Sequence, residues 1–435
     1  MSRRSRMLLA VAFVLVGRGY AAADAITDWN AFWLATAVPA PVARPANEIG
    51  IAAGYMHIAI YDAIVAIDGG YTPYATAVSP VPPGASREAA VAAAANRILT
   101  ALYPALSATI TTHYNAAIAA VSDPVARADG IAIGLAAANG LLASRNFPND
   151  GWQASVPYTY VTPPVAGSYQ RTLPSLQPAG PVTPWAKQLQ PFTMRSPSQF
   201  RADGPPALTS QQWADDLNEV QTLGALVGST RTPEQTTISL FYANASAALA
   251  INPALQISLD IRGLSSQEGL TLAENARFFA QTYTAIADAT IGCWESKYYF
   301  NFWRPITAIR NADIDGNDQT QQDAGWLPFT ITAGHPEYPS AHGCITSAMA
   351  HSMASFLGTK RPALGIPLSG NDVNGNIYTR HVDSTDDVVR EIIDARIYNG
   401  VHYRTSVVHA TVLGRKVAQW VARSYFLPLD SPQVR

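Results

Sequence analysis

The chain has 435 residues, of which 48% are hydrophobic and 14% are charged, and its formal net charge is −2. This composition is typical of a globular protein with a large core, and the length permits one large domain or two to three smaller ones. The near-neutral charge and the lack of a basic arm or Lys/Arg stripe argue against nucleic acid as a partner.

The first residues have the pattern of a secretory signal peptide. Arginines at positions 3, 4 and 6 precede the short apolar stretch Met7–Val16, and small residues follow, with cleavage expected after Ala23 or Ala25. The apolar stretch is well short of the roughly 20 residues that span a bilayer, so we expect no stable membrane anchor. We therefore expect residues 1–23 to be removed and the protein to be exported, to a periplasm or to the medium.

Helical patterns dominate the rest of the chain. In chain order, we expect helices over residues 48–68, 87–102, 123–145, 211–228, 233–250, 270–311, 340–357, 383–398 and 405–426. The proline-rich residues 147–205 predict a long surface loop or an ordered connection between bundles, and turn signals within 363–380 predict a short β-hairpin. These patterns predict an all-α protein with two packed helical bundles in one large domain, residues 24–435.

Two pairs of residues within the predicted helices have structural interpretations. His57 and Asp62 lie in the first buried helix, and we interpret them as satisfied polar groups of the core. Cys293 and Cys344 are the only cysteines, and in an exported protein they could form a disulfide. Each could equally be a buried small apolar residue, because two cysteines in so long a chain do not make a disulfide framework.

A first polar motif lies in residues 297–305, where Lys297 and Arg304 are seven positions apart. Within one helix this spacing places both side chains on one face. Two cations among Tyr, Phe and Trp would be costly to bury without an anion between them. The alternative is that both extend to solvent from a helix end.

A second motif is Pro339-Ser340-Ala341-His342-Gly343, followed by a helical run. Ser340 is placed to cap that helix, and the N-terminus of a helix attracts phosphate-like anions. A simple helix cap is the alternative. His342 would lie in the first turn, where the helix dipole disfavours a permanent imidazolium, so it could accept or donate a proton.

A third motif runs from Arg396 to His402. Arg396 supplies a guanidinium fork for oxyanion oxygens, and Gly400 allows the backbone to turn sharply toward a ligand. A lone histidine at such a place is more often a core residue than a ligand. However, six of the eight histidines fall in the last quarter of the chain, together with these motifs.

The combination of Lys-x6-Arg-Pro, Pro-Ser-(Gly/Ala)-His and Arg-x5-His resembles the signature shared by vanadium-dependent haloperoxidases and the type-2 phosphatidic acid phosphatase superfamily. Arg231-Thr-Pro-Glu-Gln-Thr, His335-Pro-Glu-Tyr-Pro and Trp294 are similar to the haloperoxidase branch. The resemblance extends from about Glu48 to the C-terminus. It implies a helical fold like that of vanadium chloroperoxidase, with the active site within residues 270–426.

The resemblance also implies a vanadate cofactor and a role for each motif residue. Vanadate would be held by Lys297, Arg304, Ser340, the backbone of Ala341, Arg396 and His402. His402 would bond to vanadium, His342 would be the acid–base residue, and Trp294 and His335 would line the halide and peroxide pocket. Ala341 stands where the family usually has glycine, but alanine also presents the backbone N–H that this position would supply.

The activity implied is oxidation of a halide by hydrogen peroxide to hypohalous acid, which reacts with a small organic acceptor, with vanadium as a Lewis acid. Chloride-oxidising members of the family tend to carry Phe at the position of His335, and bromide-oxidising members tend to carry His. We therefore expect bromide and iodide to be oxidised, with little or no chloride activity. If His335 faces solvent, it has no such role.

Two other functions fit the same motifs. A phosphatase of the superfamily would form a phosphohistidine at His402 and protonate the leaving group through His342. A catalytically silent oxyanion-binding protein is the second, although the presence of both histidines argues against it. The oligomeric state stays open: helix-rich members of this family often associate, yet no heptad seam in this sequence indicates an interface.

Overall fold

The computed structural model describes residues 24–38, 44–75, 77–160, 164–173, 181–243, 252–358, 365–372 and 374–430. The predicted signal peptide therefore lies outside the described residues. The elements in chain order are α1 (Ala25–Ala37), α2 (Ala46–Asp68), α3 (Arg87–Leu102), the 3-10 turn η1 (Pro104–Leu106), α4 (Ser107–Ala119), α5 (Pro124–Ser144), η2 (Pro184–Gln188), α6 (Gln211–Leu223), α7 (Pro233–Phe241), α8 (Pro253–Glu268), α9 (Leu272–Phe300), α10 (Pro305–Arg310), η3 (Ala312–Ile314), α11 (Ala341–Leu357), β1 (Ile366–Asn371), β2 (Ile377–Val382), α12 (Thr385–Tyr398) and α13 (Arg404–Ser424).

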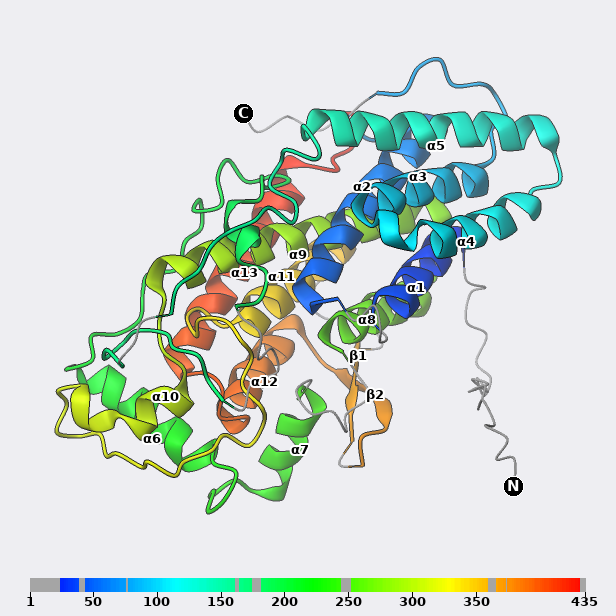
Figure 1. Ribbon diagram of the computed structural model, residues 1–435. Helices are drawn as coiled ribbons and strands as arrows, with labels where there is room; N and C mark the ends of the chain where they lie inside the picture. Colours follow the sequence, from blue (N-terminus) through cyan, green and yellow to red (C-terminus); the bar gives the residue numbers. More distant parts are fainter. Residues whose placement is uncertain are drawn as a thin grey trace, which may run out of the picture.

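The helices form an elongated assembly in which N-terminal helices gather at one end and most C-terminal elements at the other (Figure 1). Helices α2, α3 and α5 pack against one another at the N-terminal end, and α11 packs along α13. The long helix α9 contacts α2 on one side and α11 and α13 on the other. The all-α prediction is therefore confirmed, and the described residues include one small two-stranded sheet, at the predicted hairpin.

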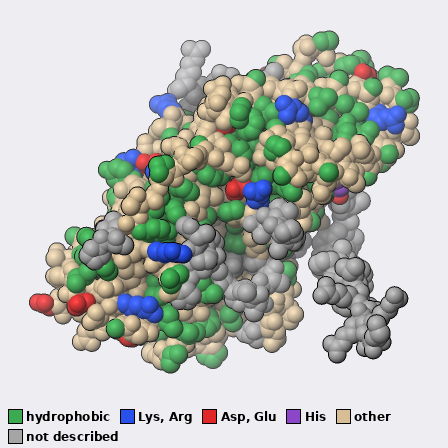
Figure 2. All heavy atoms as spheres, viewed as in Figure 1, with side chains coloured by type: hydrophobic (Ala, Val, Ile, Leu, Met, Phe, Trp, Pro, Cys, Tyr) green, Lys and Arg blue, Asp and Glu red, His purple; other side chains and the backbone are tan. Residues whose placement is uncertain are grey.

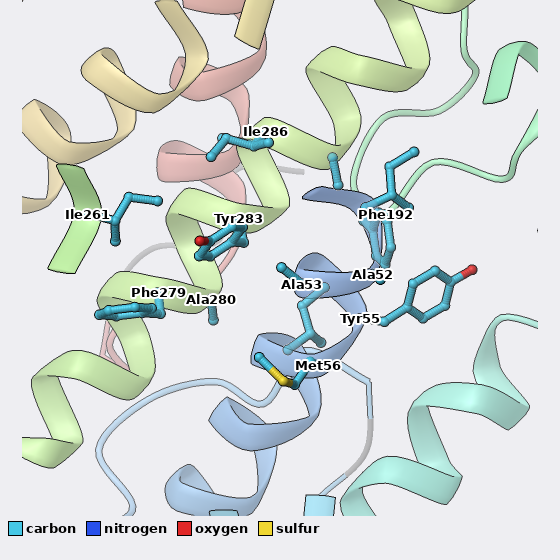
Figure 3. Close-up of a cluster of buried hydrophobic side chains, with 14 of the residues drawn as sticks. Ala52, Ala53, Tyr55, Met56, Phe192, Ile261, Phe279, Ala280, Tyr283 and Ile286 are labelled. Carbon is cyan, nitrogen blue, oxygen red and sulfur yellow. The ribbon is translucent and has the colours of Figure 1, made fainter. Parts of the chain in front are cut away.

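The contact between α2 and α9 consists of small and aromatic side chains. Ala52, Ala53 and Met56 of α2 lie opposite Ala280 and Tyr283 of α9 (Figure 3). These side chains are at most 2% exposed, and α2 has no wholly polar face because it is surrounded by other helices. The continuous apolar pattern predicted for this helix follows from that burial.

Buried polar groups connect these helices. His57 accepts a hydrogen bond at Nε2 from the Asn30 amide at 3.0 Å, and the same amide donates to the Tyr283 hydroxyl. Asp62 accepts the backbone N–H groups of Tyr74 and Ala75, which fixes the loop after α2. Asp62 is thus a satisfied core group, as predicted. His57 is satisfied at one nitrogen, whereas its Nδ1 has no hydrogen-bond partner among the described residues.

Most predicted helix bounds agree with the structure to within a few residues, including α3, which begins at Arg87 and ends at Leu102. Ser210 caps α6 as predicted, accepting the N–H of Trp213. The predicted helix over 233–250 ends at Phe241 within the described part of the chain, and residues 244–251 lie outside it. Helices α1, α4 and α8 were not predicted.

The prediction of one helix over residues 270–311 is wrong. Helix α9 ends at Phe300, Asn301 adopts a left-handed conformation with φ 49°, and a new helix, α10, starts at Pro305. Proline at position 305 favours an extended backbone at Arg304, which has φ −82° and ψ 154°. Lys297 and Arg304 therefore do not share one helical face, and the site brings them together by a turn.

The predicted hairpin is present within the described residues, with β1 and β2 antiparallel and Ile366 opposite Val382. Strand β1 is buried, and it packs on α8 and α7. Described parts of the proline-rich region 147–205 are held to α9 by Asp288, whose carboxylate accepts the N–H groups of Phe192, Thr193 and Met194. The hairpin thus packs on α7 and α8, and the proline-rich region is attached to the middle of α9.

Two described helices, α2 and α5, are long and apolar enough to cross a membrane by length and composition. Core helices of large proteins meet the same criterion, and 83% of the most apolar stretch of α2 is buried inside the molecule, against 39% for α5. On the face in Figure 2, Lys and Arg side chains are scattered singly among uncharged groups, and they form no continuous basic stripe there.

Candidate active site

The polar motifs of the C-terminal half meet around a cavity of about 450 Å³. Seven of the nine residues predicted for the site line it: Trp294, Arg304, His335, Ala341, His342, Arg396 and His402. The other two, Lys297 and Ser340, are fully buried and do not line the cavity wall. They adjoin the segment that does so, because Ser340 directly precedes Ala341.

Lys297, in the last turns of α9, holds the loop that leads to Ser340. Its Nζ donates to the carbonyl oxygens of Pro336 and Glu337 at 3.0 Å and of Pro339 at 2.5 Å. Burial, with a smaller contribution from Arg304, lowers the pKa of Lys297 to about 8. In most molecules Lys297 is therefore charged at neutral pH. This charge lies behind the cavity wall.

Arg304 joins the other two motifs. Its Nε donates to the carbonyl of His335 at 3.0 Å, and Nη1 donates to the carbonyl of Val401 at 2.9 Å. Nη2 lies 3.0 Å from Nδ1 of His335, which must accept there because a guanidinium only donates. His335 is 7% exposed, so it does not face solvent, and its ring centroid is 5.3 Å from that of Trp294.

Ser340 occupies the N-cap position of α11, but its side chain does not cap the helix. The hydroxyl is fully buried and has no hydrogen-bond partner among the described residues. A helix cap alone therefore does not explain this serine. The helix N-terminus beside it brings unpaired N–H groups and a partial positive charge to the cavity.

Arg396, in the last turn of α12, is a buried cation without a compensating carboxylate. Its Nη1 donates to the carbonyl of Tyr242 at 3.1 Å, whereas Nε has no partner among the described residues. The side chain forms no ion pair within the described parts of the chain, and burial lowers its pKa to about 9. A buried guanidinium with an unused donor is costly unless an anion binds it.

His402 follows a left-handed turn at Gly400, which has φ 76°. Gly400 lies against the carbonyl of Gly224, and a Cβ at Gly400 would not fit there. This is the sharp turn that the glycine predicts. The Nδ1 of His402 lies 2.6 Å from a carboxylate oxygen of Glu337. Because the carboxylate accepts, Nδ1 carries the proton and Nε2 does not, and the lone pair of Nε2 accepts from Nη1 of Arg304 at 3.2 Å, a contact that a bound ligand would replace.

Glu337 is a site residue that the sequence predictions did not include. It is fully buried, burial raises its pKa to about 7, and Arg304 and Lys297 act in the opposite direction. It lies within the segment His335-Pro-Glu-Tyr-Pro, so its neighbourhood was marked by the motif. Its pairing with His402 crosses 65 residues of sequence, and no pattern in the chain predicts that contact.

His342 is the second residue of α11, in the first turn as predicted. Burial and the charges of Arg396, Lys297 and Arg304 hold its pKa well below the usual range. The imidazole is therefore neutral at neutral pH. An anion placed among these cations would offset their charge and raise the pKa of His342, so that the ring could hold a proton.

Cys293 and Cys344 are both free and buried in the structure. The thiol of Cys293 lies 3.7 Å from the carbonyl of Pro339, the same carbonyl that accepts from Lys297. The structure thus has the buried-thiol alternative and no disulfide between these residues. Both cysteines serve as small side chains behind the loop that carries Ser340.

The residues present fit an oxyanion such as vanadate or phosphate. Arg304, Arg396 and Lys297 bring three cationic groups into one buried region, where Glu337 supplies a carboxyl group whose pKa is raised. Ser340 Oγ and Arg396 Nε are buried donors without a described partner. The lone pair of His402 Nε2 adds the neutral nitrogen that a metal centre needs.

Comparisons with known proteins agree with this chemistry. Residues 277–429 match the family model of the second helical-bundle domain of vanadium chloroperoxidase. The chain is 24% identical over 258 residues to vanadium chloroperoxidase of Curvularia inaequalis, in a match that covers 52% of this chain and 39% of that protein. The chain therefore matches less than half the length of this curated relative.

Solved structures show the same fold over nearly the whole chain. A bacterial vanadium-dependent iodoperoxidase superposes with a TM-score of 0.72 at 21% identity, covering 91% of this chain and 94% of that one. A bacterial vanadium-dependent chloroperoxidase superposes with a TM-score of 0.66 at 16% identity, covering 85% and 92%.

Fold and site together define the class: this is a helical protein with the vanadium haloperoxidase fold, and the resemblance predicted from the motifs is confirmed. Within it, residues 277–429 are the part that matches the family model of the second helical-bundle domain of vanadium chloroperoxidase.

Proposed function

We propose that this protein is a vanadate-dependent haloperoxidase that oxidises bromide and iodide with hydrogen peroxide to hypohalous acid. The observation that carries the proposal is the pair of buried donors without a described partner, Ser340 Oγ and Arg396 Nε, in the site that also holds the lone pair of His402 Nε2. Such donors favour a bound oxyanion, and the family of the C-terminal bundle supports vanadate as that oxyanion.

Each residue has a role that follows from its contacts. Arg304 and Arg396 would offset the charge of the anion, with Lys297 contributing from behind the wall. Glu337 keeps the proton of His402 on Nδ1, so Nε2 would be the ligand atom. His342 would give and take protons. When bound, vanadate would supply Lewis-acid activation of peroxide without a change of oxidation state.

The activity is tested on one preparation of the protein in two assays. Bromide and iodide oxidation is measured with peroxide, with and without added orthovanadate, beside hydrolysis of p-nitrophenyl phosphate. We expect vanadate-dependent halide oxidation that a large excess of phosphate inhibits, because both anions would occupy one pocket. Phosphate hydrolysis without halide oxidation would identify a phosphatase instead. Neither activity in protein that retains vanadate would identify a silent binding protein.

The halide preference is proposed from His335. Its imidazole lines the cavity next to Trp294 and bonds to Arg304, so a polar group stands beside the anion site. A polar wall retains water and weakens the local field, whereas a dry aromatic wall strengthens it. We expect bromide and iodide turnover with little chloride turnover, and a higher chloride-to-bromide ratio in His335→Phe. Chloride turnover equal to that of bromide in the unchanged protein would contradict the proposal.

A further inference from the structure

The cavity is larger than its inorganic reactants require. Its volume is about 450 Å³. A tetrahedral oxyanion, a peroxide and a halide occupy roughly 200 Å³ if each heavy atom takes about the space of one water molecule. Cavities of roughly 300–1,000 Å³ commonly hold organic ligands. More than half of the cavity is therefore available to another molecule.

The space beyond the oxyanion residues has an apolar wall. Ile345 and Met349 of α11 stand one turn apart, Ile257 comes from α8, and Leu368 comes from β1. These four side chains come from three different elements and line the same cavity as His342 and His402. Apolar walls of this kind bind hydrocarbon or aromatic surface and offer nothing to a halide or to peroxide.

One face of α8 adds hydrogen-bonding groups to the same space. Asn252, Gln256 and Asp260 are spaced four residues apart, so they lie along one side of the helix, and all three line the cavity. We call the space between this face and the apolar wall the α8 arm. It combines an apolar surface with polar groups at one side, as small-molecule sites usually do.

Asp260 is the ionisable residue of the α8 arm. It is 3% exposed, and one of its oxygens accepts the backbone N–H of Ser369 at 2.6 Å. Within the described parts of the chain it forms no ion pair, and burial raises its pKa well above the usual range. A buried carboxyl group of this kind gains from a ligand that hydrogen-bonds to it.

We propose that the α8 arm binds a phenol, with the hydroxyl group on Asp260 and the ring against Ile257 and Met349, so that halogenation takes place inside the cavity. The proposal rests on the proposed function, because an oxidised halogen attacks electron-rich carbon. A phenol ring is electron-rich and planar, which suits an apolar wall. Its hydroxyl group donates a hydrogen bond to the carboxyl group of Asp260, which lies one helical turn from Ile257 on α8.

The reaction balances with the reactants already named. Halide, hydrogen peroxide and one proton give hypohalous acid and water, so the halide loses two electrons and the peroxide gains them. A ring carbon of the phenol then forms a carbon–halogen bond as the halogen–oxygen bond breaks. The ring loses its proton, and this proton and the released hydroxide form a second water. Asp260 orients the ring and takes no part in the electron transfer.

Binding is measured on the protein without vanadate, by calorimetry and saturation-transfer NMR with phenol and with anisole, which lacks the hydroxyl proton. We expect saturable binding of phenol and a clear preference for phenol over anisole. Asp260→Asn should weaken phenol binding roughly fivefold to tenfold and remove the preference, because the one remaining oxygen accepts from the N–H of Ser369 and the NH₂ group cannot accept from the phenol hydroxyl. Met349→Trp should fill the arm and abolish binding of both probes.

Asp62→Asn is the matched control. Asp62 is also a buried aspartate of a helix that accepts backbone N–H groups, but it does not line the cavity. Phenol affinity in this variant should equal that of the unchanged protein. Circular dichroism melting of each variant reports folding. Phenol binding that does not saturate, that is equal in Met349→Trp, or that shows the same phenol preference in Asp260→Asn would overturn the proposal.

A separate assay distinguishes this proposal from the proposed function. Vanadate-loaded protein is given iodide and peroxide without any organic acceptor, and triiodide is measured. Triiodide formation without phenol binding would overturn the α8 arm alone. Phenol binding that Asp260→Asn weakens, without triiodide formation, would overturn the haloperoxidase function while the binding site stands.

Discussion

At the scale of single residues, the contact between Glu337 and His402 decides which ring nitrogen faces the cavity. The carboxylate holds the proton on Nδ1 at 2.6 Å, and Nε2 lies 3.2 Å from Nη1 of Arg304, as an acceptor. The same contact also limits the rotation of the ring. Nε2 is thus oriented before any anion arrives, which would lower the entropy that binding costs.

Removing Glu337 should therefore weaken vanadate binding. We expect Glu337→Ala to lower vanadate affinity by roughly 10- to 100-fold, the usual effect of losing a partner of a ligating histidine. Glu337→Gln should lose less, because its amide oxygen can still accept from Nδ1. Equilibrium dialysis with vanadium analysis measures affinity, and nitrogen-15 shifts of His402 report the tautomer.

Glu295→Gln serves as the control for Glu337, because Glu295 lies on α9 near Lys297 but pairs with Arg201 and not with the site. Its vanadate affinity should match that of the unchanged protein. If Glu337→Ala retained vanadate at full affinity with an unchanged tautomer of His402, the orienting role would be wrong.

The two site histidines should respond differently to truncation. His402→Ala removes the nitrogen ligand, so we expect the protein to lose vanadate on dialysis. His342→Ala removes the acid–base group, so vanadate should stay while turnover falls roughly 10²–10⁴-fold. Vanadium content and halide oxidation are measured on both variants. Equal loss of vanadium from the two would show that the roles are misassigned.

At the scale of elements, the crossing of α11 and α13 places Ser340 and His342. The two helices approach closely at Gly343 and Gly414: a Cβ on Gly414 would lie 2.1 Å from the carbonyl oxygen of Cys344. Backbone atoms cannot yield as a flexible side chain would, so a methyl group there must separate the helices. The helix N-terminus at the site depends on this separation.

Gly414→Ala should therefore destabilise the protein by about 1–3 kcal/mol and weaken vanadate binding, because overpacking shifts backbone. Gly50→Ala is the control: its Cβ would meet only Ile286 Cγ2, at an ordinary 3.5 Å. That substitution, in the interior of α2, should be neutral or stabilise by about 0.5–1 kcal/mol. Urea unfolding measures both, and equal stability of the two variants would contradict the steric argument.

The elements also show how far sequence patterns reach. Periodicity predicted α2, α3, α5 and α11 closely, because α2 is buried on nearly all sides and the other three helices each bury an apolar face. It failed at Asn301 and Pro305, where the pattern continues through a break that only the backbone conformation reveals. Periodicity also did not predict α8, because this helix has mixed polarity and its polar side lines a cavity.

The sequence predicted some features of the candidate site and not others. The motifs and their spacing predicted Arg304, His342, Arg396 and His402 as site residues. A resemblance to a family identifies such positions, whereas hydrophobic periodicity does not. It did not give Glu337 its partner, since a pair 65 residues apart depends on tertiary structure. Nor could it show that Ser340 leaves its helix uncapped, which requires the rotamer of the side chain.

At the scale of the whole molecule, acid stability should depend on His57. Burial lowers its pKa to about 3, whereas an exposed histidine titrates near 6.5. The unfolded chain therefore takes up a proton before the folded one does. The stability contributed by His57 is complete above pH 6.5 and is lost as the pH falls toward 3.

We expect the free energy of unfolding to decrease between pH 6.5 and 5 by about 2 kcal/mol more in the unchanged protein than in His57→Phe. Urea unfolding at the two pH values gives both differences. The variant loses the bond to Asn30, so its stability at pH 7 is compared separately. Identical pH dependence of the two proteins would show that His57 is protonated in the fold.

The position of α9 has a consequence for how this chain can be divided. The stretch that matches a known family starts at residue 277, inside α9, yet one side of that helix is covered by α2, more than two hundred residues earlier. A fragment cut at the family boundary would keep the three polar motifs and expose Phe279, Ala280 and Tyr283 to water. The part that is similar in sequence is thus not a transplantable module, and any recombination that moves the candidate site must carry α2 with it.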